Sequence, residues 1–351
     1  MKKGYLKKRL EEMVDRRNCL KFMGILGFGI AAPALIAKPT EGKLSGNLHQ
    51  VSRTRPLMGT FVNITVIDPS RDKADEVQEK AFARMVELVK LFDRHAPDTP
   101  VSWLNDKGSL NDISPAIAAL FYQSAYFNHI SKGAFDITVL PLLELYRETF
   151  AKTGTPPTLR QVKEKMALID TTKVKTDKQG IRFLKEGMQV TLDGIAKGYI
   201  VDEASNLIER QGIKYALINA GGDIRAIGGN GPEKAWKIGV SDPWGKRKYV
   251  EVLELSNGAV ATSGNYEVYF DKEKLHHHII DTATGDSPRE TVSATVVAPT
   301  VMEADALSTA MFVLPPHESI DLAHSLVDIE TMIIARGGRT YRSRGWKQVR
   351  V

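Results

Sequence analysis

The sequence predicts an α+β fold in which largely antiparallel sheets pack against helices. Two features of the residue pattern support this prediction. Helical spacing of apolar residues marks the earlier part of the chain, whereas short strand-like segments dominate from residue 215 onward. The intervals between those later segments are too short for helical crossovers, so the strands are expected to pair antiparallel. Early helices followed by a run of strands are typical of α+β proteins.

The first half of the chain is expected to contain one strand and three helices. "TFVNITVI" (60–67) alternates as a half-buried strand does, and residues 72–93 repeat apolar side chains at helical spacing. A second helix is expected to begin at Ser114, a capping residue that is followed by proline. The third lies in "VTLDGIAKGYIVDEASNLIERQG" (190–212), where an apolar run turns at Asp193 into an amphipathic helix.

The second half is expected to be mainly strands. A helix is predicted at about 302–314 and a shorter one near 318–326, followed by closing strands. The strand segments expected before them are "YALINA", "AWKIGV", "YVEVLEL", "AVATSG", "YEVYF", "HHHIID" and "TVSATVVA".

The charge of the chain is concentrated at its N-terminus. The 351 residues carry a formal net charge of +6, of which +5 falls within residues 1–37 and +1 on the remainder. A nucleic-acid-binding protein would spread basic residues over a docking face, so we expect no nucleic-acid partner. The only cysteine, Cys19, also lies in this segment, which excludes thiol catalysis and cysteine metal sites in the rest of the chain.

Residues 1–37 are expected to be an export signal. Arg16 and Arg17 precede a moderately apolar run, "ILGFGIAAPALIA", that ends in small residues. This arrangement indicates a twin-arginine signal that exports the folded protein to the periplasm, with a Sec signal or an uncleaved membrane anchor as alternatives. Residues 38–50 are expected to be a linker, and residues 51–351 the functional domain.

The segment 190–212 contains a candidate phosphate-binding site. A helix N-terminus offers unpaired backbone N–H groups and a partial positive charge. Gly194 and Gly198 allow a backbone or ligand to approach closely, and Lys197 adds an ammonium group in the first turn. The alternative is that Asp193 caps the helix and Lys197 is solvated.

Two glycine-containing segments carry weaker signals. "INAGGDIRAIGG" (218–229) lacks the Rossmann fingerprint, and is either a tight hairpin that requires positive φ angles or a backbone that passes close to a ligand. "GAVATSGNYEVYF" (258–270) lacks the nucleophile elbow of serine hydrolases. It places Thr262 and Ser263 at a strand end, where their hydroxyls form either a polar turn or a ligand contact.

Three consecutive histidines stand in "HHHIIDTATG" (276–285). Because consecutive strand residues point to opposite faces, the three side chains cannot all bind one metal ion. One of them, with Asp281 nearby, is a candidate acid or base, and a run of surface histidines is the alternative.

The segment "VMEADALSTAMFVLP" (301–315) contains a candidate magnesium site. Asp305 and Thr309 are four residues apart, so they lie on one helix face within reach of a single ion. Carboxylate and hydroxyl oxygens suit Mg²⁺, which usually shares its coordination shell with substrate phosphates. The alternative is that Asp305 caps the helix or pairs with a base and that Thr309 bonds back to a backbone carbonyl.

Together these motifs resemble the ApbE family, the FAD:protein FMN transferases. The resemblance implies a two-lobed α+β body and covers residues from about 54 to 340. Its motifs follow the family order: "PLMGTFVNITV", "FDRHAPDTPVSWLN", "GAFDITVLPL", "LDGIAKGYIVD", "INAGGDIRAIG", "ATSGNYEVYF", "HHIIDTATG" and "EADALSTAMFVL".

The resemblance also implies a reaction. Members of the family bind FAD and Mg²⁺, transfer the FMN half to a threonine or serine hydroxyl of a target flavoprotein, and release AMP. For this chain it implies a periplasmic, Mg²⁺-dependent transferase whose acceptor is a membrane-associated redox protein. Hydrolysis of FAD to FMN and AMP at the same site is the alternative enzymatic activity. A flavin-binding module without turnover is the alternative from a different class.

Roles for individual residues follow from the resemblance. The side chains of Asp305 and Thr309 and the backbone carbonyl of Gly194 are the expected Mg²⁺ ligands, and Asp305 is also expected to be catalytic. His278 is the expected proton-transfer residue, with an aspartate as the alternative. The positions expected to contact FAD are Met58, His95, Ala134, Phe135, Asp136, Thr191, Asp193, Lys197, Thr262, Ser263 and Ile279.

Two motifs depart from the family pattern. The family often has "DLGGIAKG", whereas this chain has Thr191 at the leading position and an aspartate at 193. A ligand contact of the family aspartate therefore either passes to Asp193 or is lost. His95 stands where many relatives have tyrosine, and some relatives that differ there hydrolyse FAD, so the balance between transfer and hydrolysis is open.

Overall fold

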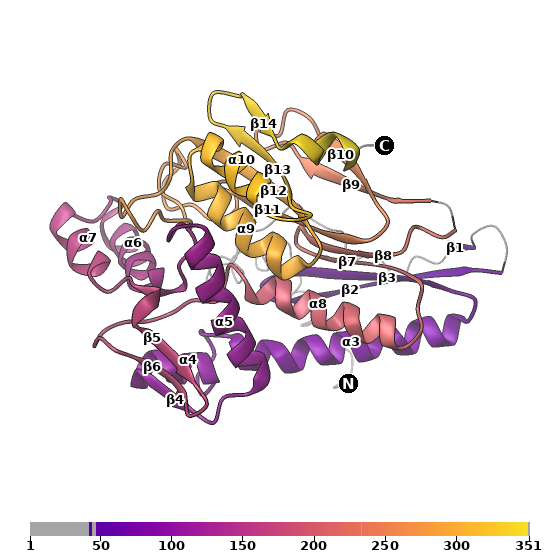
Figure 1. Ribbon diagram of the computed structural model, residues 1–351, viewed down its shortest axis with the longest axis horizontal. Helices are drawn as coiled ribbons and strands as arrows, with labels where there is room; N and C mark the ends of the chain where they lie inside the picture. The colour runs from indigo at the N-terminus through magenta and orange to yellow at the C-terminus, as the bar shows by residue number, and fades with distance from the viewer. Residues whose placement is uncertain (1–41, 44–46, 233, 350–351) are drawn as a thin grey trace, which may run out of the picture.

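A nine-stranded sheet forms the centre of the computed structural model, which describes residues 42–43, 47–232 and 234–349. The strand order is β1-β2-β3-β7-β8-β11-β12-β13-β14 (Figure 1), and all of these pairings are antiparallel, as predicted. The strands are β1 (Gly42–Lys43), β2 (His49–Leu57), β3 (Thr60–Asp68), β7 (Tyr215–Ala220), β8 (Asp223–Ile227), β11 (Gly258–Gly264), β12 (Thr291–Ala298), β13 (Glu330–Ala335) and β14 (Thr340–Arg342).

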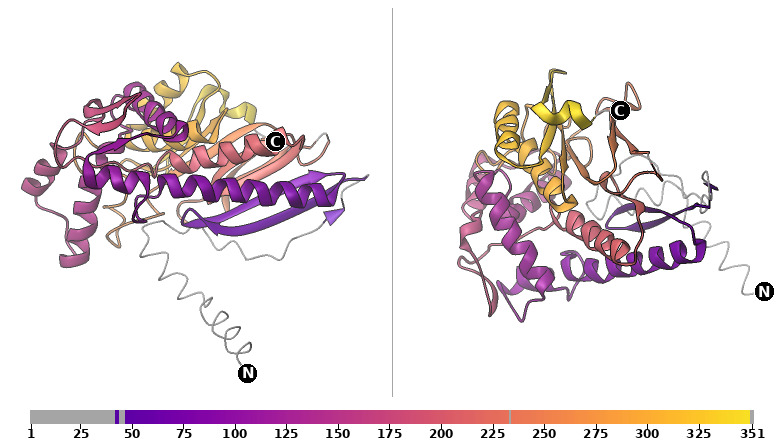
Figure 2. Two further views of the ribbon diagram at one scale, coloured as in Figure 1. Left: turned by 90° about the horizontal axis from the view of Figure 1, so that it is seen from below. Right: turned by 45° about the vertical axis from the view of Figure 1, so that its right-hand side comes forward.

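Helices cover one face of this sheet (Figures 1 and 2). They are α3 (Arg71–Phe92), α8 (Ala196–Arg210), α9 (Val301–Val313) and α10 (Pro316–Ser325). The helix α8 packs between α3 and α9, and α9 lies on β11 and β12. Gln78 on α3 fixes the helix to the sheet, because its buried amide donates hydrogen bonds to the carbonyls of Val51 (2.8 Å) and Ile64 (2.9 Å).

A two-stranded sheet covers part of the opposite face. It is the hairpin of β9 (Trp236–Ser241) and β10 (Tyr249–Leu255). Its inward side chains, among them Ile238 and Leu253, share a second core with Val260 and Val297 of the central sheet. The sheet is therefore buried on both faces here, and every residue of β12 is buried.

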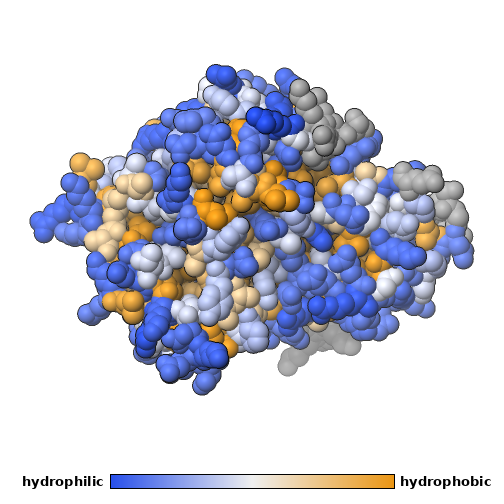
Figure 3. Space-filling model, in the orientation of Figure 1, coloured by the Kyte–Doolittle hydropathy of each residue, from blue (hydrophilic) through white to orange (hydrophobic). Residues whose placement is uncertain are grey.

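A smaller part of the molecule lies at one end of the central sheet (Figure 1). It contains α4 (Pro100–Lys107), α5 (Pro115–Ile130), α6 (Leu140–Thr153), α7 (Leu159–Met166), the turns η1 (Ile137–Val139) and η2 (Thr171–Lys173), and a sheet in the order β4-β6-β5. Its strands are β4 (Ser109–Asn111), β5 (Val174–Asp177) and β6 (Gly180–Phe183), and η3 (Arg344–Val349) closes the chain elsewhere. Apolar side chains gather toward the middle of the face in Figure 3, and polar ones surround them.

The five helices predicted from the sequence correspond to α3, α5, α8, α9 and α10. Two predicted strands, "YEVYF" and "HHHIID", are wrong. Residues 266–270 and 276–281 form an irregular loop held by a single bridge between Tyr269 and His277. The helices α4, α6 and α7 were not expected, and β1 and the start of β2 fall within the range predicted as a linker. The segment predicted to be an export signal lies outside the described residues, whose helices are too short or too polar to span a lipid bilayer.

Candidate functional site

A cavity of about 220 Å³ lies where the two parts of the molecule meet. It is bounded by the first turn of α8, by α9, by the end of β11, by the β2–β3 turn and by the segment before α6. All of the site residues predicted from the sequence line this cavity: Met58, His95, Ala134, Phe135, Asp136, Thr191, Asp193, Gly194, Lys197, Thr262, Ser263, His278, Ile279, Asp305 and Thr309. Their chemical roles stay predictions. A more apolar cavity of about 160 Å³ adjoins the first and shares Met58, His95 and Lys197 with it.

The first turn of α8 points its lysine into a buried ion pair. Lys197 Nζ lies 3.0 Å from Oδ2 of Asp223, which begins β8 and is 3% exposed in its side chain. Burial lowers the pKa of Lys197, but the attraction of Asp223 and then Asp305 outweighs it and raises that pKa overall. Lys197 is therefore a paired cation at the cavity wall and not a solvated one.

The N-terminus of α8 has no side-chain cap. Ile195 occupies the capping position, and Asp193 makes an ion pair with Arg94 instead (Oδ2 to Nη2, 3.1 Å). The interpretation of Asp193 as a helix cap is therefore wrong. One backbone N–H of this first turn, that of Gly198, donates to Oδ2 of Asp305 at 3.1 Å.

Two hydroxyl groups, on β11 and on α9, lie close together in the cavity wall. Ser263 Oγ at the end of β11 lies 3.4 Å from Thr309 Oγ1, and Thr309 Oγ1 donates to the Asp305 carbonyl at 3.3 Å. A Cβ on Gly194 would lie 3.3 Å from Thr309 Oγ1, so the turn before α8 touches α9 here. Asp305 does not cap α9, because Thr300 and Glu303 form its capping box.

This donor set fits a hard divalent cation. It consists of one carboxylate, hydroxyls and a nearby backbone carbonyl, all of them oxygen ligands. Among the described residues, no group of three or more His, Cys, Asp or Glu side chains could hold a metal ion. A cation here would consequently take only part of its coordination shell from the protein and the remainder from a ligand or water.

The carboxyl groups around Lys197 are disfavoured as anions. Burial raises the pKa of Asp305 well above its usual range, and the neighbouring Asp223 raises it further. Burial likewise raises the pKa values of Asp223 and Glu267. Three carboxyl groups thus interact with one ammonium group, so the cavity is an environment in which an additional cation is stabilising.

His278 presents a defined ring nitrogen to the cavity. Its Nδ1 lies 3.0 Å from the carbonyl oxygen of Val268, and its backbone N–H donates to that same oxygen at 3.1 Å. A carbonyl can only accept, so Nδ1 carries the proton and Nε2 is left as an acceptor. Burial lowers the pKa of His278, which keeps the ring neutral at neutral pH. The other two histidines are not a surface run: His277 is fully buried, and His276 is 14% exposed in its side chain, with Nδ1 3.0 Å from Asp286.

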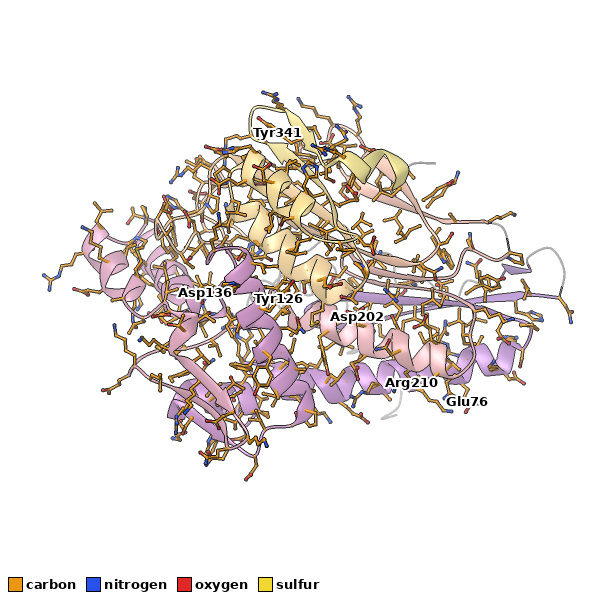
Figure 4. The ribbon with its side chains drawn as sticks, in the orientation of Figure 1. Glu76, Tyr126, Asp136, Asp202, Arg210 and Tyr341 are labelled. Atoms are coloured by element: carbon orange, nitrogen blue, oxygen red, sulfur yellow. The ribbon has the colours of Figure 1, made fainter. Side chains whose placement is uncertain are left out.

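Several predicted contact residues also have structural partners. The carboxylate of Asp136 accepts hydrogen bonds from Thr138 N (2.8 Å) and Thr171 Oγ1 (2.7 Å), and Thr191 Oγ1 accepts one from Asp193 N (3.2 Å). Asp136 thereby fixes the cavity wall within the smaller part (Figure 4). Because these side chains already make internal hydrogen bonds, we expect Asp136 and Thr191 to contact a ligand mainly through their backbone atoms.

The β2–β3 turn supplies a strained residue to the same cavity. Met58 and Gly59 occupy the turn with φ angles of 53° and 67°. A two-residue hairpin turn with both φ angles positive matches the twist of its strands, but only glycine adopts that conformation without cost. Met58 is therefore held in an unfavourable backbone conformation where it faces the cavity.

Sequence reasoning missed five charged residues of the wall, one of which is Arg147, an ion-pair partner of Glu144. Asp223 and Glu267 stand inside motifs that were recognised, but neither was expected to pair with or face Lys197. Arg94 and Glu144 form an ion pair of 3.0 Å at the cavity edge. The sequence signal that could have indicated Asp223 is its position directly after the Gly221-Gly222 turn. The strand that follows this turn, β8, lies against α8.

The family model of the ApbE family matches residues 58–333. The chain belongs to the ApbE family. Its relatives include the FAD:protein FMN transferases of Haemophilus influenzae (30% identity over 289 residues, 78% of this chain and 83% of that protein) and Escherichia coli K12 (29% over 278 residues, 75% and 78%). This ApbE family member thus matches most of the length of both relatives.

Solved structures show the same fold. The ApbE protein of Thermotoga maritima has a TM-score of 0.76 and 29% identity, covering 86% of this chain and 99% of its own. The flavin transferase ApbE of Vibrio cholerae has a TM-score of 0.77 and 26% identity, with the same coverage. The family assignment and the α+β fold predicted from the sequence are confirmed.

Proposed function

We propose that this ApbE family member transfers the FMN half of FAD to a threonine or serine hydroxyl of a target protein and releases AMP. Its relatives are named FAD:protein FMN transferases, and a solved neighbour is a flavin transferase. The observation that carries the proposal is the convergence of Lys197, Asp305, Thr309 and His278 on one cavity.

The reaction requires in-line attack at the phosphorus atom on the FMN side. The hydroxyl oxygen forms a new P–O bond, the bond from that phosphorus to the bridging oxygen breaks, and AMP leaves. Positioning and neutralisation of charge supply most of the catalysis in such transfers. We assign the charge role to Lys197, whose pairing with Asp223 fixes its ammonium group at the first turn of α8.

The acceptor hydroxyl must lose its proton during attack, because its own pKa is high. We assign this proton to Nε2 of His278. The contact between Nδ1 and Val268 supports the assignment, since it orients the ring and leaves Nε2 unprotonated.

We propose Mg²⁺ as the cation that completes the site. Asp305, Thr309 and the Gly194 carbonyl would hold it, and when bound it would neutralise charge on the diphosphate oxygens. Met58, Ala134, Phe135 and Ile279 are proposed to contact the flavin nucleotide, and the adjoining cavity gives a dinucleotide additional room.

We also propose that the enzyme works in the periplasm on a membrane-associated redox protein. The charged and apolar pattern of residues 1–37 supports a twin-arginine export signal, although it lies outside the described residues. Mass spectrometry of the mature protein would locate the cleavage site.

The decisive experiment incubates the protein with FAD and Mg²⁺, once without an acceptor and once with a candidate acceptor protein. AMP released only with the acceptor, together with an FMN-sized adduct on its threonine, supports transfer. AMP released without the acceptor supports FAD hydrolysis, and no AMP in either case supports a flavin-binding module. Asp305→Asn should abolish AMP release, whereas full activity of this variant would overturn the site assignment.

A further inference from the structure

The β9–β10 hairpin ends in an exposed tip that no part of the cavity uses. Its sequence, "DPWGKRKY" (242–249), contains three consecutive basic residues between two aromatic ones. Trp244 is 43% exposed and Tyr249 is 41% exposed, although aromatic side chains of this size are usually buried. Lys246, Arg247 and Lys248, which we call the basic triplet, are all exposed.

The tip is ordered by its own hydrogen bonds. The carboxylate of Asp242 accepts hydrogen bonds from the backbone N–H groups of Trp244 (3.0 Å) and Arg247 (2.9 Å). The backbone carbonyl of Asp242 accepts a third from Gly245 N (3.1 Å). The tip therefore presents the indole and the basic triplet in one fixed loop. A preorganised loop loses little conformational entropy when it binds a surface.

The outward side of the hairpin extends this surface. The ring of Tyr249 lies against Gly239, where a Cβ would come within 2.4 Å of it, and Lys248 Nζ sits 5.1 Å from the centre of the same ring. Val252, which pairs with Gly239, is 39% exposed. The inward side chains of both strands are buried in the second core, whereas Tyr249 and Val252 on the outer side are exposed.

We propose that this hairpin tip docks on an anionic lipid surface. Aromatic rings that flank lysine and arginine are the composition of segments at membrane interfaces, where the rings enter the headgroup region and the cations meet lipid phosphates. The charge of the tip is local, because the chain outside residues 1–37 carries a net charge of only +1. Three exposed apolar side chains are too few for a stable protein–protein interface, and this favours lipid over a protein partner.

The position of the hairpin fits such docking. The strands β9 and β10 lie at the end of the molecule opposite α7 and the three-stranded sheet (Figure 1). No residue of the tip lines either cavity, so docking here leaves the proposed catalytic residues untouched. The proposal therefore stands independently of the transferase activity.

The test measures partitioning of the full chain onto vesicles of phosphatidylcholine alone and of phosphatidylcholine with phosphatidylglycerol. The variant K246E/R247E/K248E should bind the anionic vesicles at least about tenfold more weakly than the wild type, because each cation near an anionic surface contributes roughly fivefold. The matched control is R160E/K163E/K165E on α7, which makes the same change in charge and should bind like the wild type. The N-terminal segment is common to all of these proteins, so the difference between the two charge-reversal variants reports on the hairpin tip.

A second measurement locates the contact. Lipids that carry a bromine or nitroxide quencher should reduce the tryptophan fluorescence of the wild type, and W244F should lose that quenching. Equal partitioning of the two charge-reversal variants would overturn the proposal. So would quenching that persists in W244F, or a wild type that binds neutral and anionic vesicles equally. Binding to a purified acidic protein without any vesicle dependence would assign the tip to a protein partner instead.

Discussion

The backbone N–H of Gly198 donates a hydrogen bond to Oδ2 of Asp305 at 3.1 Å, which joins the first turn of α8 to the proposed metal ligand on α9. The two helices approach so closely that a Cβ on Gly198 would lie 2.6 Å from Met302 Cα and from the Val301 carbonyl oxygen. Asp202, one turn further along α8, accepts hydrogen bonds from the backbone N–H groups of these same two α9 residues at 2.9 and 2.8 Å (Figure 4).

This contact predicts the effect of Gly198→Ala. The added methyl group must push α8 away from the α9 backbone, and overpacking of this kind costs about 1–3 kcal/mol of stability. We expect a lower urea midpoint and a higher Mg²⁺ concentration for half-maximal AMP release. The control is Gly337→Ala, where a Cβ meets open space. If both variants required the same Mg²⁺ concentration, the α8–α9 contact would not position the site.

The ion pair between Lys197 and Asp223 predicts separate effects on stability and on activity. Lys197→Met leaves the buried Asp223 unpaired, which should cost about 3–5 kcal/mol, and it removes a cation from the reaction, which should lower AMP release at least about a hundredfold. The double variant Lys197→Met/Asp223→Asn should recover much of the thermal stability but none of the activity. Recovery of activity along with stability would show that Lys197 has only a structural role.

Arg94 predicts an effect on FAD affinity. Its side chain is 10% exposed and neutralises Asp193 and Glu144 at the cavity edge. Arg94→Met leaves both carboxylates facing an anionic substrate, so we expect KM for FAD to rise about tenfold, which corresponds to roughly 1.4 kcal/mol. Asp193→Asn added to Arg94→Met should reverse part of this rise, and a double-mutant cycle measures the coupling.

The matched control for that cycle is Arg84→Met. Arg84 lies on α3, the helix that Arg94 follows, and pairs with α8 through Glu203 at 2.9 Å, but it is 37% exposed and does not line the cavity. Exposed pairs contribute about 0–1 kcal/mol, so this variant should keep the KM of the wild type. Equal shifts in both variants would point to a general loosening of α3 against α8.

The buried His277 predicts a loss of stability in acid. Burial lowers the pKa of this side chain to about 3, against an ordinary value of 6.5. Between these two values the unfolded chain binds a proton that the folded chain does not, so acidification favours unfolding. The free energy of unfolding should fall by up to about 1.4 kcal/mol per pH unit as the pH drops from 6.5 toward 3.

A comparison with His277→Gln isolates this contribution, because glutamine does not titrate. Urea denaturation at several pH values should show the free energy of unfolding of the wild type falling more steeply with acidification than that of His277→Gln, whatever their difference at pH 7. Parallel pH dependences would mean that His277 does not contribute to the acid sensitivity.

The regular elements of the central body were largely readable from the sequence. Periodicity and capping signals are local, so Ser114 correctly marked the beginning of a helix, and "TVSATVVA" formed a fully buried strand. The segment 266–281 misled the prediction because its alternation resembles that of a strand. Its side chains instead turn toward the cavity, as Val268 and His278 do, and its backbone bonds to itself.

The clustering of the predicted residues could be anticipated from the sequence, but the ion pairs among them could not. The motifs and the family resemblance pointed to residues that line one cavity, since each motif sits at the end of an element that reaches it. The pairing of Lys197 with Asp223, and of Asp193 with Arg94, depends on which elements become neighbours in space. Neither pair is close in sequence, and charge pairing over 26 or 99 residues leaves no periodic signal.

The smaller part of the molecule is an insertion between α3 and α8. The helices α3 and α8 pack against each other, and residues 93–195 leave and return between them. This insertion provides His95, Phe135 and Glu144 to the cavity wall, whereas Asp305 and Thr309 belong to the central body. A chimaera that replaces residues 93–190 with those of a relative would therefore exchange His95, Phe135 and Glu144 and would keep Gly194, Asp305 and Thr309 of the proposed metal site.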